Sequence, residues 1–335
     1  MMNDCVLLGH GGGGRLSHQL IEQEIVARFG QGPLQTLPDA ATLELDSRRI
    51  CFTTDSFVVH PLEFPGGNIG DLAVHGTVND LAVSGARPRW LSLGLILEEG
   101  LPLATLRRVL DSVQRAAEQC EVAVVTGDTK VVRRGQCDGL YINTSGIGEA
   151  IPGFALSLSR VGLGDCILVS GPLGDHGAAV LSAREGFQMQ NGPLSDSRPV
   201  HRLVQSVADL AADIRFMRDP TRGGLATVLN EMTAGQSYGI RIRARDLPFS
   251  PGTNALAEML GLDLLHVASE GCLVLLCAES VAAAILARWQ ALPEGVDARA
   301  IGRVTDQAGR VILETAIGGQ RVVDVPSGEL LPRIC

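Results

Sequence analysis

Aromatic residues are scarce in this chain, and long apolar runs are missing. Phe, Trp and Tyr together make up 4% of its 335 residues, whereas glycine contributes 40 residues. Small aliphatic residues therefore have to build the core, which favours an α/β chain with many tight turns. The longest apolar stretches, such as residues 91–97, fall far short of the roughly 20 residues of a membrane helix. The length predicts a globular protein with two domains and no membrane partner.

Basic residues are in the minority. The chain has 28 Lys and Arg against 37 Asp and Glu, and its net charge is -9. A nucleic acid or an anionic membrane would need a basic surface, so we expect neither as a partner. The acidic side chains could instead hold a metal ion.

Closely paired cysteines are missing too. The eight cysteines form no Cys-x-x-Cys pair, and no secretory leader is recognised before them. They are Cys5, Cys51, Cys120, Cys137, Cys166, Cys272, Cys277 and Cys335. Zinc and disulfide frameworks are therefore not expected, and we place the protein in the reducing cytoplasm.

The apolar and polar patterns divide the chain into four parts. We expect a glycine-rich arm and helix, a first α/β domain, a second α/β domain and a flexible tail. Their expected boundaries are residues 1–42, 43–153, 154–322 and 323–335.

The periodicity also predicts individual elements. In the first domain we expect a helix over residues 70–84 and a β pattern over residues 43–59, broken by a polar turn. In the second domain we expect a helix over residues 200–212 and strands near residues 240, 265 and 272.

Three aspartates stand at strand ends or on the helix that follows a strand. They are Asp55, Asp80 and Asp128, and Lys130 lies beside the last of them. Together they could hold magnesium on nucleotide phosphates, with Lys130 neutralising one phosphate. Taken singly, an aspartate at a strand end is more often a turn former or a helix cap. Asp80 is the exception, because a carboxylate inside an apolar helix is costly unless something binds it.

Four consecutive glycines, Gly11, Gly12, Gly13 and Gly14, precede the first predicted helix. Their backbone N–H groups could cradle an anion, although a flexible linker is an equal alternative. No Walker-type motif is present, so ATP would have to bind in another way.

The second half contains further candidate residues. Residues 170–177 join a strand to a helix, and there we favour Asp175 as a cap and His176 as a solvated side chain over direct catalysis. After Asp219, two glycines behind an arginine suggest close approach to a ligand. Glu270 lies between apolar segments, where burial would raise its pKa and suit a general base. An exposed turn residue is the favoured alternative for Glu270.

The last residue, Cys335, has no chain beyond it to hold its thiol in a core. A thiolate is a good nucleophile, and residues 332–334 are typical of a stiff tether. Chance placement of one of eight cysteines is the competing explanation. We therefore expect a movable tail that carries a reactive thiol.

These segments resemble the HypE family of hydrogenase maturation proteins, which are carbamoyl dehydratases of the PurM-like superfamily. The resemblance runs nearly end to end. It is carried by residues 10–15, 53–59, 64–67, 76–82, 126–132, 174–177, 218–225 and 331–335. Most of these segments occur across the superfamily, which includes aminoimidazole ribonucleotide synthase, and only the Pro-Arg-Ile-Cys end is specific to the HypE family.

The resemblance implies a two-domain PurM-like α/β fold, with a ferredoxin-like second domain and a homodimer formed through strands of the first domains. It implies that Asp55, Asp80, Asp128 and Lys130 hold ATP and Mg2+ while the glycine-rich arm closes over the phosphates. Gly127 and Asp219 lie in the same motifs and are expected to contact the nucleotide.

The resemblance also implies a reaction on Cys335. A carbamoyltransferase partner, HypF, loads a carbamoyl group onto its sulfur as a thiocarboxamide. ATP phosphorylates the amide oxygen, Glu270 is nominated as the base that removes nitrogen protons, and Lys130 offsets charge. The resulting thiocyanate supplies cyanide to iron on a HypC–HypD scaffold of nickel-iron hydrogenase maturation. Two alternatives stay open: another PurM-like ATP-dependent synthase with a free small substrate, and a non-catalytic thiol carrier.

Overall fold

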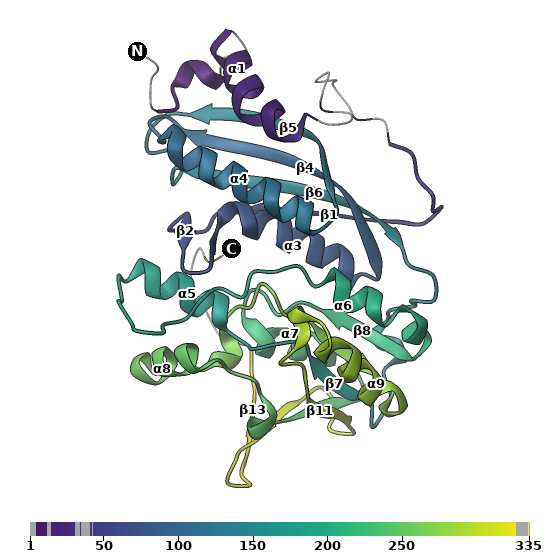
Figure 1. Cartoon of the computed structure of the whole chain (residues 1–335). Helices are drawn as coiled ribbons and strands as arrows, with labels where there is room; N and C mark the ends of the chain where they lie inside the picture. The colour runs from purple at the N-terminus through teal and green to yellow at the C-terminus, as the bar shows by residue number, and fades with distance from the viewer. Residues whose placement is uncertain are drawn as a thin grey trace.

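The fold consists of two layers, each built on its own β-sheet. This computed structural model describes residues 5–11, 15–30, 34, 41, 43–325 and 334. Figure 1 shows the first sheet and its helices in the upper half of the molecule, with the second sheet below them. The elements of the upper layer end with the strand Leu140–Ala150, and the lower layer begins after it.

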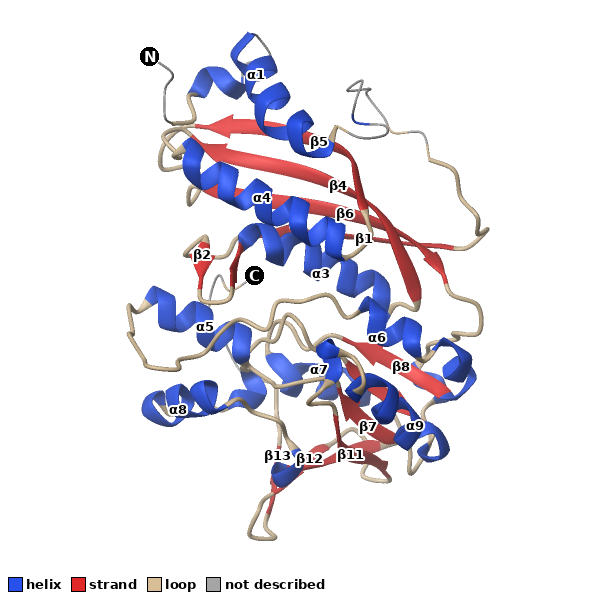
Figure 2. Ribbon diagram, in the orientation of Figure 1, coloured by secondary structure: helices blue, strands red, loops and turns tan. Residues whose placement is uncertain are grey.

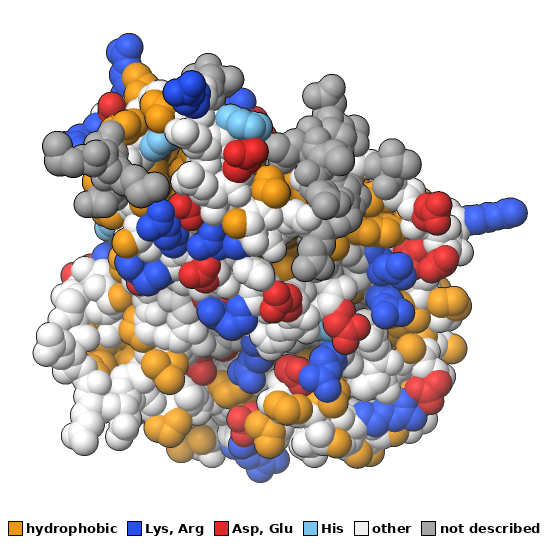
Figure 3. Space-filling view, turned by 45° about the horizontal axis from the view of Figure 1, so that its top comes forward, with side chains coloured by type: hydrophobic (Ala, Val, Ile, Leu, Met, Phe, Trp, Pro, Cys, Tyr) orange, Lys and Arg blue, Asp and Glu red, His pale blue; other side chains and the backbone are white. Residues whose placement is uncertain are grey.

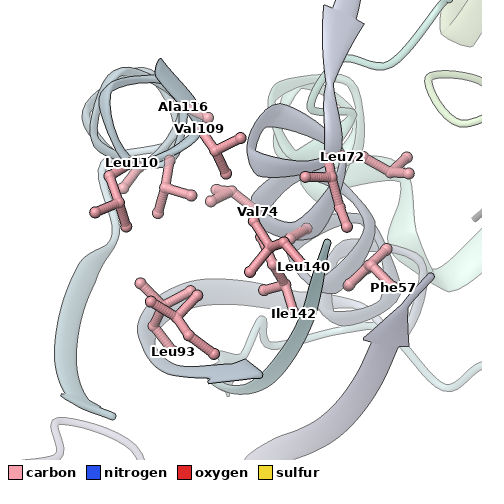
Figure 4. Close-up of a cluster of buried hydrophobic side chains, with 14 of the residues drawn as sticks. Phe57, Leu72, Val74, Leu93, Val109, Leu110, Ala116, Leu140 and Ile142 are labelled. Atoms are coloured by element: carbon pink, nitrogen blue, oxygen red, sulfur yellow. The ribbon is translucent and has the colours of Figure 1, made fainter. Parts of the chain in front are cut away.

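The first sheet has four strands in the order β1-β6-β4-β5. They are β1 (Ile50–Phe57), β6 (Leu140–Ala150), β4 (Ala86–Glu98) and β5 (Ala123–Val132). Only the β4–β5 pair is parallel. Two helices, α3 (Ile69–Val83) and α4 (Leu103–Gln119), cover the same face of this sheet (Figure 2). Figure 4 shows side chains of both helices packed against Leu93, Leu140 and Ile142 of the sheet.

Helix α3 starts where its sequence provides a cap. The Asn68 side chain accepts a hydrogen bond from the Gly70 N–H at 2.8 Å, and Asp71 accepts from the Asn68 N–H at 3.1 Å. This reciprocal capping box satisfies donors that the first turn leaves unpaired. The predicted helix over residues 70–84 is therefore confirmed within one residue at each end.

The expected β pattern over residues 43–59 is only partly correct. Strand β1 begins at Ile50, and residues 43–49 form no strand. The polar stretch is held by side chains instead, because the Asp46 N–H donates to Glu149 at 2.8 Å and Glu149 accepts from Arg89 at 3.0 Å. These contacts replace the ladder that a hairpin would have formed.

The second sheet has seven strands in the order β13-β12-β9-β11-β7-β10-β8, and only the β12–β9 pair is parallel. The strands are β7 (Cys166–Val169), β8 (Ile214–Arg218), β9 (Gly239–Arg243), β10 (Val274–Cys277), β11 (Arg299–Thr305), β12 (Val311–Glu314) and β13 (Gln320–Val322). The helices around it are α5 (Asp175–Arg184), α6 (His201–Ser206), α7 (Gly224–Thr233), α8 (Pro251–Leu260) and α9 (Glu279–Gln290).

One prediction in this half was wrong, and another was only partly correct. The residues near 265 form a single 3-10 turn, Leu264–His266, in which Asp263 accepts from the Leu265 N–H at 3.1 Å. The helix expected over residues 200–212 ends at Ser206 and is followed by the 3-10 segment Ala208–Asp213. The strand β8 and the helix α8 were not predicted, because short elements with few apolar repeats leave little periodic signal.

The N-terminal segment packs beside the first sheet. It contains the 3-10 turn Leu8–Gly11 and then a continuous helical run made of α1 (Arg15–Leu20), a π-helical stretch (Ile21–Val26) and α2 (Ala27–Phe29). Glu24 is buried, and its carboxylate accepts from Arg28 at 3.2 Å and from Arg107 of α4 at 2.9 Å. The ion pair between Glu24 and the half-exposed Arg107 joins the run to α4.

A short hairpin, β2 (Glu63–Phe64) and β3 (Gly67–Asn68), precedes α3.

Two further features are the distribution of charge on the surface and the absence of a membrane-spanning helix among the described residues. Acidic and basic side chains are interspersed over the face that Figure 3 displays. Among the residues that the structure describes, no helix combines the length and the apolar character needed to span a bilayer.

The two layers share their cores. Ala82 and Val83 of α3 belong to a buried cluster formed mainly by the second layer. Conversely, Val180, Ala268 and Ile334 belong to the cluster of the first layer. The junction between the layers is therefore packed along part of its length, and a cavity occupies another part.

Candidate active site

A cavity of about 750 Å³ lies between the two layers, at the edge of the first sheet where β1 runs beside α3. Strand β8 and the loop that follows it form the opposite wall. The lining residues are Phe52, Thr53, Asp55, Ser56, Phe57, Gly76, Asp80, Val83, Ser84, Leu156, Phe216, Met217, Arg218, Asp219, Thr221, Arg222, Glu231 and Glu270. Four carboxylates that the sequence singled out are among them.

Asp55 and Asp80 meet across the gap between β1 and α3. Thr53 donates a hydrogen bond to Asp80 at 2.8 Å, and Asp55 and Asp80 interact directly through their side chains. Burial and the neighbouring charge of Asp80 raise the pKa of Asp55 to about 6, although Arg222 acts in the opposite direction. These two expected ligands are therefore brought together.

Asp219 and Glu270 come from the second layer and are both buried, at 9% and 3% exposure. Burial, followed by the charge of Asp80, raises the pKa of Asp219 to about 7. Burial, followed by the charge of Asp219, raises the pKa of Glu270 well above its usual value. The favoured expectation of an exposed Glu270 was wrong, because apolar strand and loop segments enclose it.

Hydrogen bonds and close packing hold the backbone around Glu270. The buried carboxylate of Asp196 accepts from the Glu270 N–H at 3.1 Å and from the Gly271 N–H at 3.0 Å. The Asn79 amide donates to the Glu270 carbonyl at 3.0 Å. A Cβ at Gly271 would lie 1.7 Å from the Asp196 carbonyl oxygen, so any side chain there would displace Glu270. Meanwhile the Glu270 Oε1 atom is buried and has no hydrogen-bond partner among the residues that the structure describes.

Sequence reasoning missed Asp196, because it lies in a polar loop and its partners follow 74 and 75 residues later. No local pattern marks such a contact. The sequence pattern also assigns no separate role to Asn79. Its amide also donates to the Arg198 carbonyl at 3.0 Å and accepts from the Val200 N–H at 2.8 Å.

Four mutually repelling carboxylates in one cavity are suited to a divalent cation. Within the described part of the chain, no three His, Cys, Asp or Glu side chains form a metal-binding group by themselves. Hard oxygen donors from a nucleotide phosphate would therefore be needed to complete the coordination of magnesium.

Asp128 and Lys130 lie elsewhere. Their side chains form an exposed ion pair of 3.0 Å on β5, the edge strand opposite β1. Three strand spacings separate the two edges, which is about 14 Å. The expected cluster of Asp55, Asp80 and Asp128 is therefore not formed within one chain.

The strand registers also place Asp128 on the other face of the sheet. Asp55 pairs with Thr144, which pairs with Leu93, which pairs with Gly127. Thr144 contacts Thr77 of α3 at 2.5 Å, so this row faces the helices. Asp128 is one residue beyond Gly127, and successive side chains of a strand point to opposite faces. Asp128 and Lys130 consequently point away from α3.

The glycine candidates divide between described and undescribed residues. Gly11 packs against β5, where an added Cβ would lie 2.8 Å from the Val131 nitrogen. At Gly127 a Cβ would lie 2.3 Å from the Leu93 carbonyl oxygen, so strand contact explains this glycine. Gly12, Gly13 and Gly14 lie outside the described residues, as does Cys335.

The two glycines after Asp219 lie close to other backbone segments of the protein. Gly223 and Gly224 have positive φ values of 72° and 60°. A Cβ at Gly224 would meet the Leu265 carbonyl oxygen at 2.7 Å, so the local backbone accounts for the glycine pair. Thr221 and Arg222, just before them, do line the cavity.

Asp175 and His176 differ from the favoured interpretation. Asp175 is buried and accepts hydrogen bonds from Ser250 and Thr253, while Gly174 occupies the N-cap position. His176 is completely buried and not solvated. Its Nε2 atom contacts the carbonyl oxygen of Ile334, and burial lowers the pKa of its ring to about 4.

Comparisons with known proteins agree with this architecture. Two family profiles match: the N-terminal domain of AIR synthase related protein over residues 38–150 and its C-terminal domain over residues 162–314. The carbamoyl dehydratase HypE of Bradyrhizobium diazoefficiens is 47% identical, over 99% of this chain and 97% of its own length.

Two solved structures are also similar. A crystal structure of the hydrogenase maturation protein HypE in complex with ATP has 45% identity and a TM-score of 0.94, and the match covers 98% of this chain and 99% of that one. A crystal structure of a HypE–HypF complex contains a chain with 41% identity and a TM-score of 0.81, covering 92% of this chain and 99% of that one.

Proposed function

Because the chain belongs to the HypE family of carbamoyl dehydratases, we propose that its cavity dehydrates a carbamoyl group carried on Cys335. The chain is an ATP-dependent enzyme of hydrogenase maturation with a two-domain PurM-like α/β fold. The observation that carries the residue assignments is the convergence of Asp55, Asp80, Asp219 and Glu270 in one interdomain cavity. Neither a soluble small substrate nor a passive thiol carrier accounts for both this cavity and the family relationship.

The reaction removes one water equivalent from a thiocarboxamide. The amide oxygen attacks the γ-phosphorus of ATP, ADP leaves, and one nitrogen proton is lost. The second nitrogen proton then departs as the carbon–oxygen bond breaks, so the oxygen leaves within inorganic phosphate. A carbon–nitrogen triple bond remains on sulfur as a thiocyanate. Phosphorylation is needed because an amide oxygen is otherwise a poor leaving group.

Glu270 is the proposed base for these nitrogen protons. Burial raises the pKa of Glu270, and a carboxylate with a raised pKa binds a proton more strongly, as a general base must. Its Oε1 atom has no partner in the described part of the chain, so this oxygen would be available to a substrate N–H. Asp196, Asn79 and Gly271 hold the backbone on either side of this side chain.

Asp55 and Asp80 are the proposed magnesium ligands of this chain, and Asp219 contributes to the same nucleotide pocket. The cation would neutralise phosphate charge when it is bound. The raised pKa values of Asp55 and Asp219 support this role, because a cation would relieve the repulsion that raises them.

Asp128, Lys130 and Gly11 are proposed to act on the pocket of a second copy. They gather along β5, whereas Asp55 and Asp80 lie at the β1 edge. The outward face of the sheet carries apolar side chains, including Phe52 at 66% and Ile96 at 41% exposure. Packing two such faces about a two-fold axis along the strands would set β5 of one copy against β1 of the other. A homodimer would thus bring the two groups of residues together, and Lys130 would then offset phosphate charge. We propose that Gly12, Gly13, Gly14 and Gly127 help to cover the phosphates along the same β5 edge.

The proposed partners follow from the relatives. A HypE chain has been solved together with HypF, which supports a carbamoyltransferase as the source of the group on Cys335. Delivery of cyanide to a HypC–HypD iron scaffold and a cytoplasmic location complete the proposal. The domain limits are proposed as before, with residues 323–335 as the tail that carries Cys335.

Intact mass spectrometry tests the proposal. Incubation of the purified chain with HypF, ATP and carbamoyl phosphate should add one carbamoyl group, and magnesium with further ATP should then remove the mass of one water. Cys335→Ala should abolish both changes. Glu270→Gln should accept the carbamoyl group but slow water loss by about 100-fold or more, as expected for a general base.

Asp80→Asn serves as the matched variant for nucleotide binding. It should accept the carbamoyl group normally and lose both ATP affinity and dehydration, because Asp80 lines the proposed nucleotide cavity and the group is loaded on Cys335. Wild-type protein that gains the carbamoyl group yet never loses water would contradict the dehydratase assignment to this cavity.

A further inference from the structure

A buried histidine that the reaction does not use contacts the penultimate residue of the chain. His176 lies on α5, is fully buried, and its Nε2 atom meets the Ile334 carbonyl oxygen. The two residues are 158 positions apart. Ile334 itself is only 6% exposed and belongs to the hydrophobic cluster of the first layer. Ile334 is thus seated between the layers.

The hydrogen bonds around His176 determine which ring nitrogen carries the proton. A carbonyl oxygen can only accept, so Nε2 must donate to Ile334. On the other side, Nδ1 lies 2.9 Å from Ser195 Oγ. That hydroxyl oxygen already accepts from the Ser197 N–H at 3.1 Å and can use its proton toward Nδ1. The Ser195–Ser197 turn therefore selects the neutral tautomer that presents an N–H to the tail.

Packing reinforces this geometry. The Phe64 ring meets the His176 ring edge-on, with centroids 5.3 Å apart and planes at 87°. Phe64 is also part of the cluster that contains Ile334. Because a neutral ring pays no charge-desolvation cost, a completely buried histidine can serve as a permanent donor here.

The same helix is joined to the wall of the active-site cavity. The Gly177 N–H donates to the Ala268 carbonyl at 3.0 Å, and the Gly174 N–H is bonded to Ser269 Oγ at 2.8 Å. Glu270 is the next residue of that wall. A tail held by His176 is consequently attached beside the segment that carries the proposed base.

We propose that His176 is a docking residue that seats the C-terminal tail at Ile334 and so positions the adjoining Cys335 for reaction. The proposal deepens the role given to Cys335 above and rests on it for its consequence, although the docking contact stands on the geometry alone. His176 acts through Ile334 and is a positioning residue.

Trimming by a carboxypeptidase tests docking without ATP, HypF or a carbamoyl group. A carboxypeptidase cleaves only a chain end that is extended in its active site. The rate at which Cys335 and then Ile334 are removed, measured by intact mass, therefore reports how often the tail is released. His176→Leu, which removes the donor, should be trimmed on the order of 10-fold faster than wild type, the size expected for a lost buried hydrogen bond. His176→Gln places an amide N–H near the Nε2 position and should restore slow trimming.

His75→Gln is the matched control. His75 is also buried and also contacts this loop, through Ser197 Oγ at 3.1 Å, but no contact joins it to Ile334. It should be trimmed like wild type. Ser195→Ala removes the group that selects the tautomer and should accelerate trimming even if His176→Leu fails to fold. Equal trimming of wild type, folded His176→Leu and Ser195→Ala would overturn the proposal, whatever the dehydratase assay shows.

Discussion

At the scale of single residues, the cavity is an arrangement of carboxyl groups that resist ionisation. Asp55, Asp219 and Glu270 come from different parts of the chain, and burial is the largest cause of the raised pKa in each case. Their charges also repel one another and Asp80. Such a site is unfavourable for the empty protein at neutral pH and favourable for one that binds a cation or accepts protons.

This cost gives Asp219→Asn a pH-dependent effect on stability. The folded pKa of Asp219 is about 7, whereas its ordinary value is 3.8. Between these values the folded state holds the proton more tightly, so its stability falls as the pH rises through this window. Asparagine removes the penalty and should raise the free energy of unfolding at pH 8 by on the order of 1–4 kcal/mol. Near pH 4 the gain should vanish.

Denaturant unfolding of both proteins at pH 4, 6 and 8 measures this difference. The variant should also lose ATP affinity, because a substitution that stabilises a functional site by removing one of its groups commonly costs function. An equal gain at pH 4 and pH 8 would contradict a charge-based cause.

At the scale of elements, α3 connects the fold to the site. All of its residues are buried except Asp71, which completes the N-terminal cap, and Asp80, which faces the cavity. The preceding residue, Asn79, uses its side chain to hold the backbone of Arg198, Val200 and Glu270 in the second layer. One helix therefore orients a ligand residue and joins the layers at the same point.

Asn79→Ala should destabilise the protein strongly. It removes three buried hydrogen bonds and leaves two carbonyl groups and one N–H group without that partner. We expect the free energy of unfolding to fall by about 2–4 kcal/mol, measured by denaturant titration. Asn143→Ala is the control, because this exposed amide also bonds two groups, Asp55 O and Ser56 Oγ. Its loss should cost less than about 1 kcal/mol, since water can replace it.

At the scale of the whole molecule, the proposed nucleotide-binding residues of one chain fall into two separate groups. The carboxylates face the interdomain cavity on the helix side of the sheet, whereas Asp128 and Lys130 lie on the outward side of the opposite edge strand. No small rotation of side chains can bridge two faces of a sheet. In the proposed two-fold pairing, β5 of one copy would lie beside the edge strand β1 of the other, so Asp128 and Lys130 would approach that pocket around the sheet edge while Phe52 and Ile96 become covered.

Complementation between inactive copies tests this arrangement. Asp80→Asn and Lys130→Ala should each be inactive alone. Random exchange of equal amounts should make half of the dimers mixed, each with one intact site, and restore about a quarter of wild-type water loss. Intact mass after loading with carbamoyl phosphate measures the yield. As a control, a mixture of Asp80→Asn with the Asp80→Asn/Lys130→Ala double variant should stay inactive. If the first mixture recovers no activity although subunit exchange is confirmed, Lys130 acts in the site of its own chain.

Local patterns were enough to identify many parts of this protein. The capped, apolar run of α3 predicts its own limits, and the motifs around Asp55, Asp80 and Asp219 indicate the residues of the cavity, because both signals lie within a few neighbouring positions. The same motifs indicate the family, which the comparisons confirm. The short strand β8 and the 3-10 turn at Leu264–His266 escaped, since their form depends on distant partners.

Only the packing of the two layers decided which side chains are buried and which face of the sheet each side chain occupies. Glu270 is a turn residue by its neighbours, yet Asp196 and Asn79 enclose its backbone from segments 74 and 191 residues away. His176 similarly meets Ile334 across 158 residues. Asp128 follows Gly127 in a motif like that of Asp55, but strand order and register send it to the other edge and face. Residue type sets what a side chain can do, whereas long-range packing sets its neighbours, its solvent and therefore its pKa.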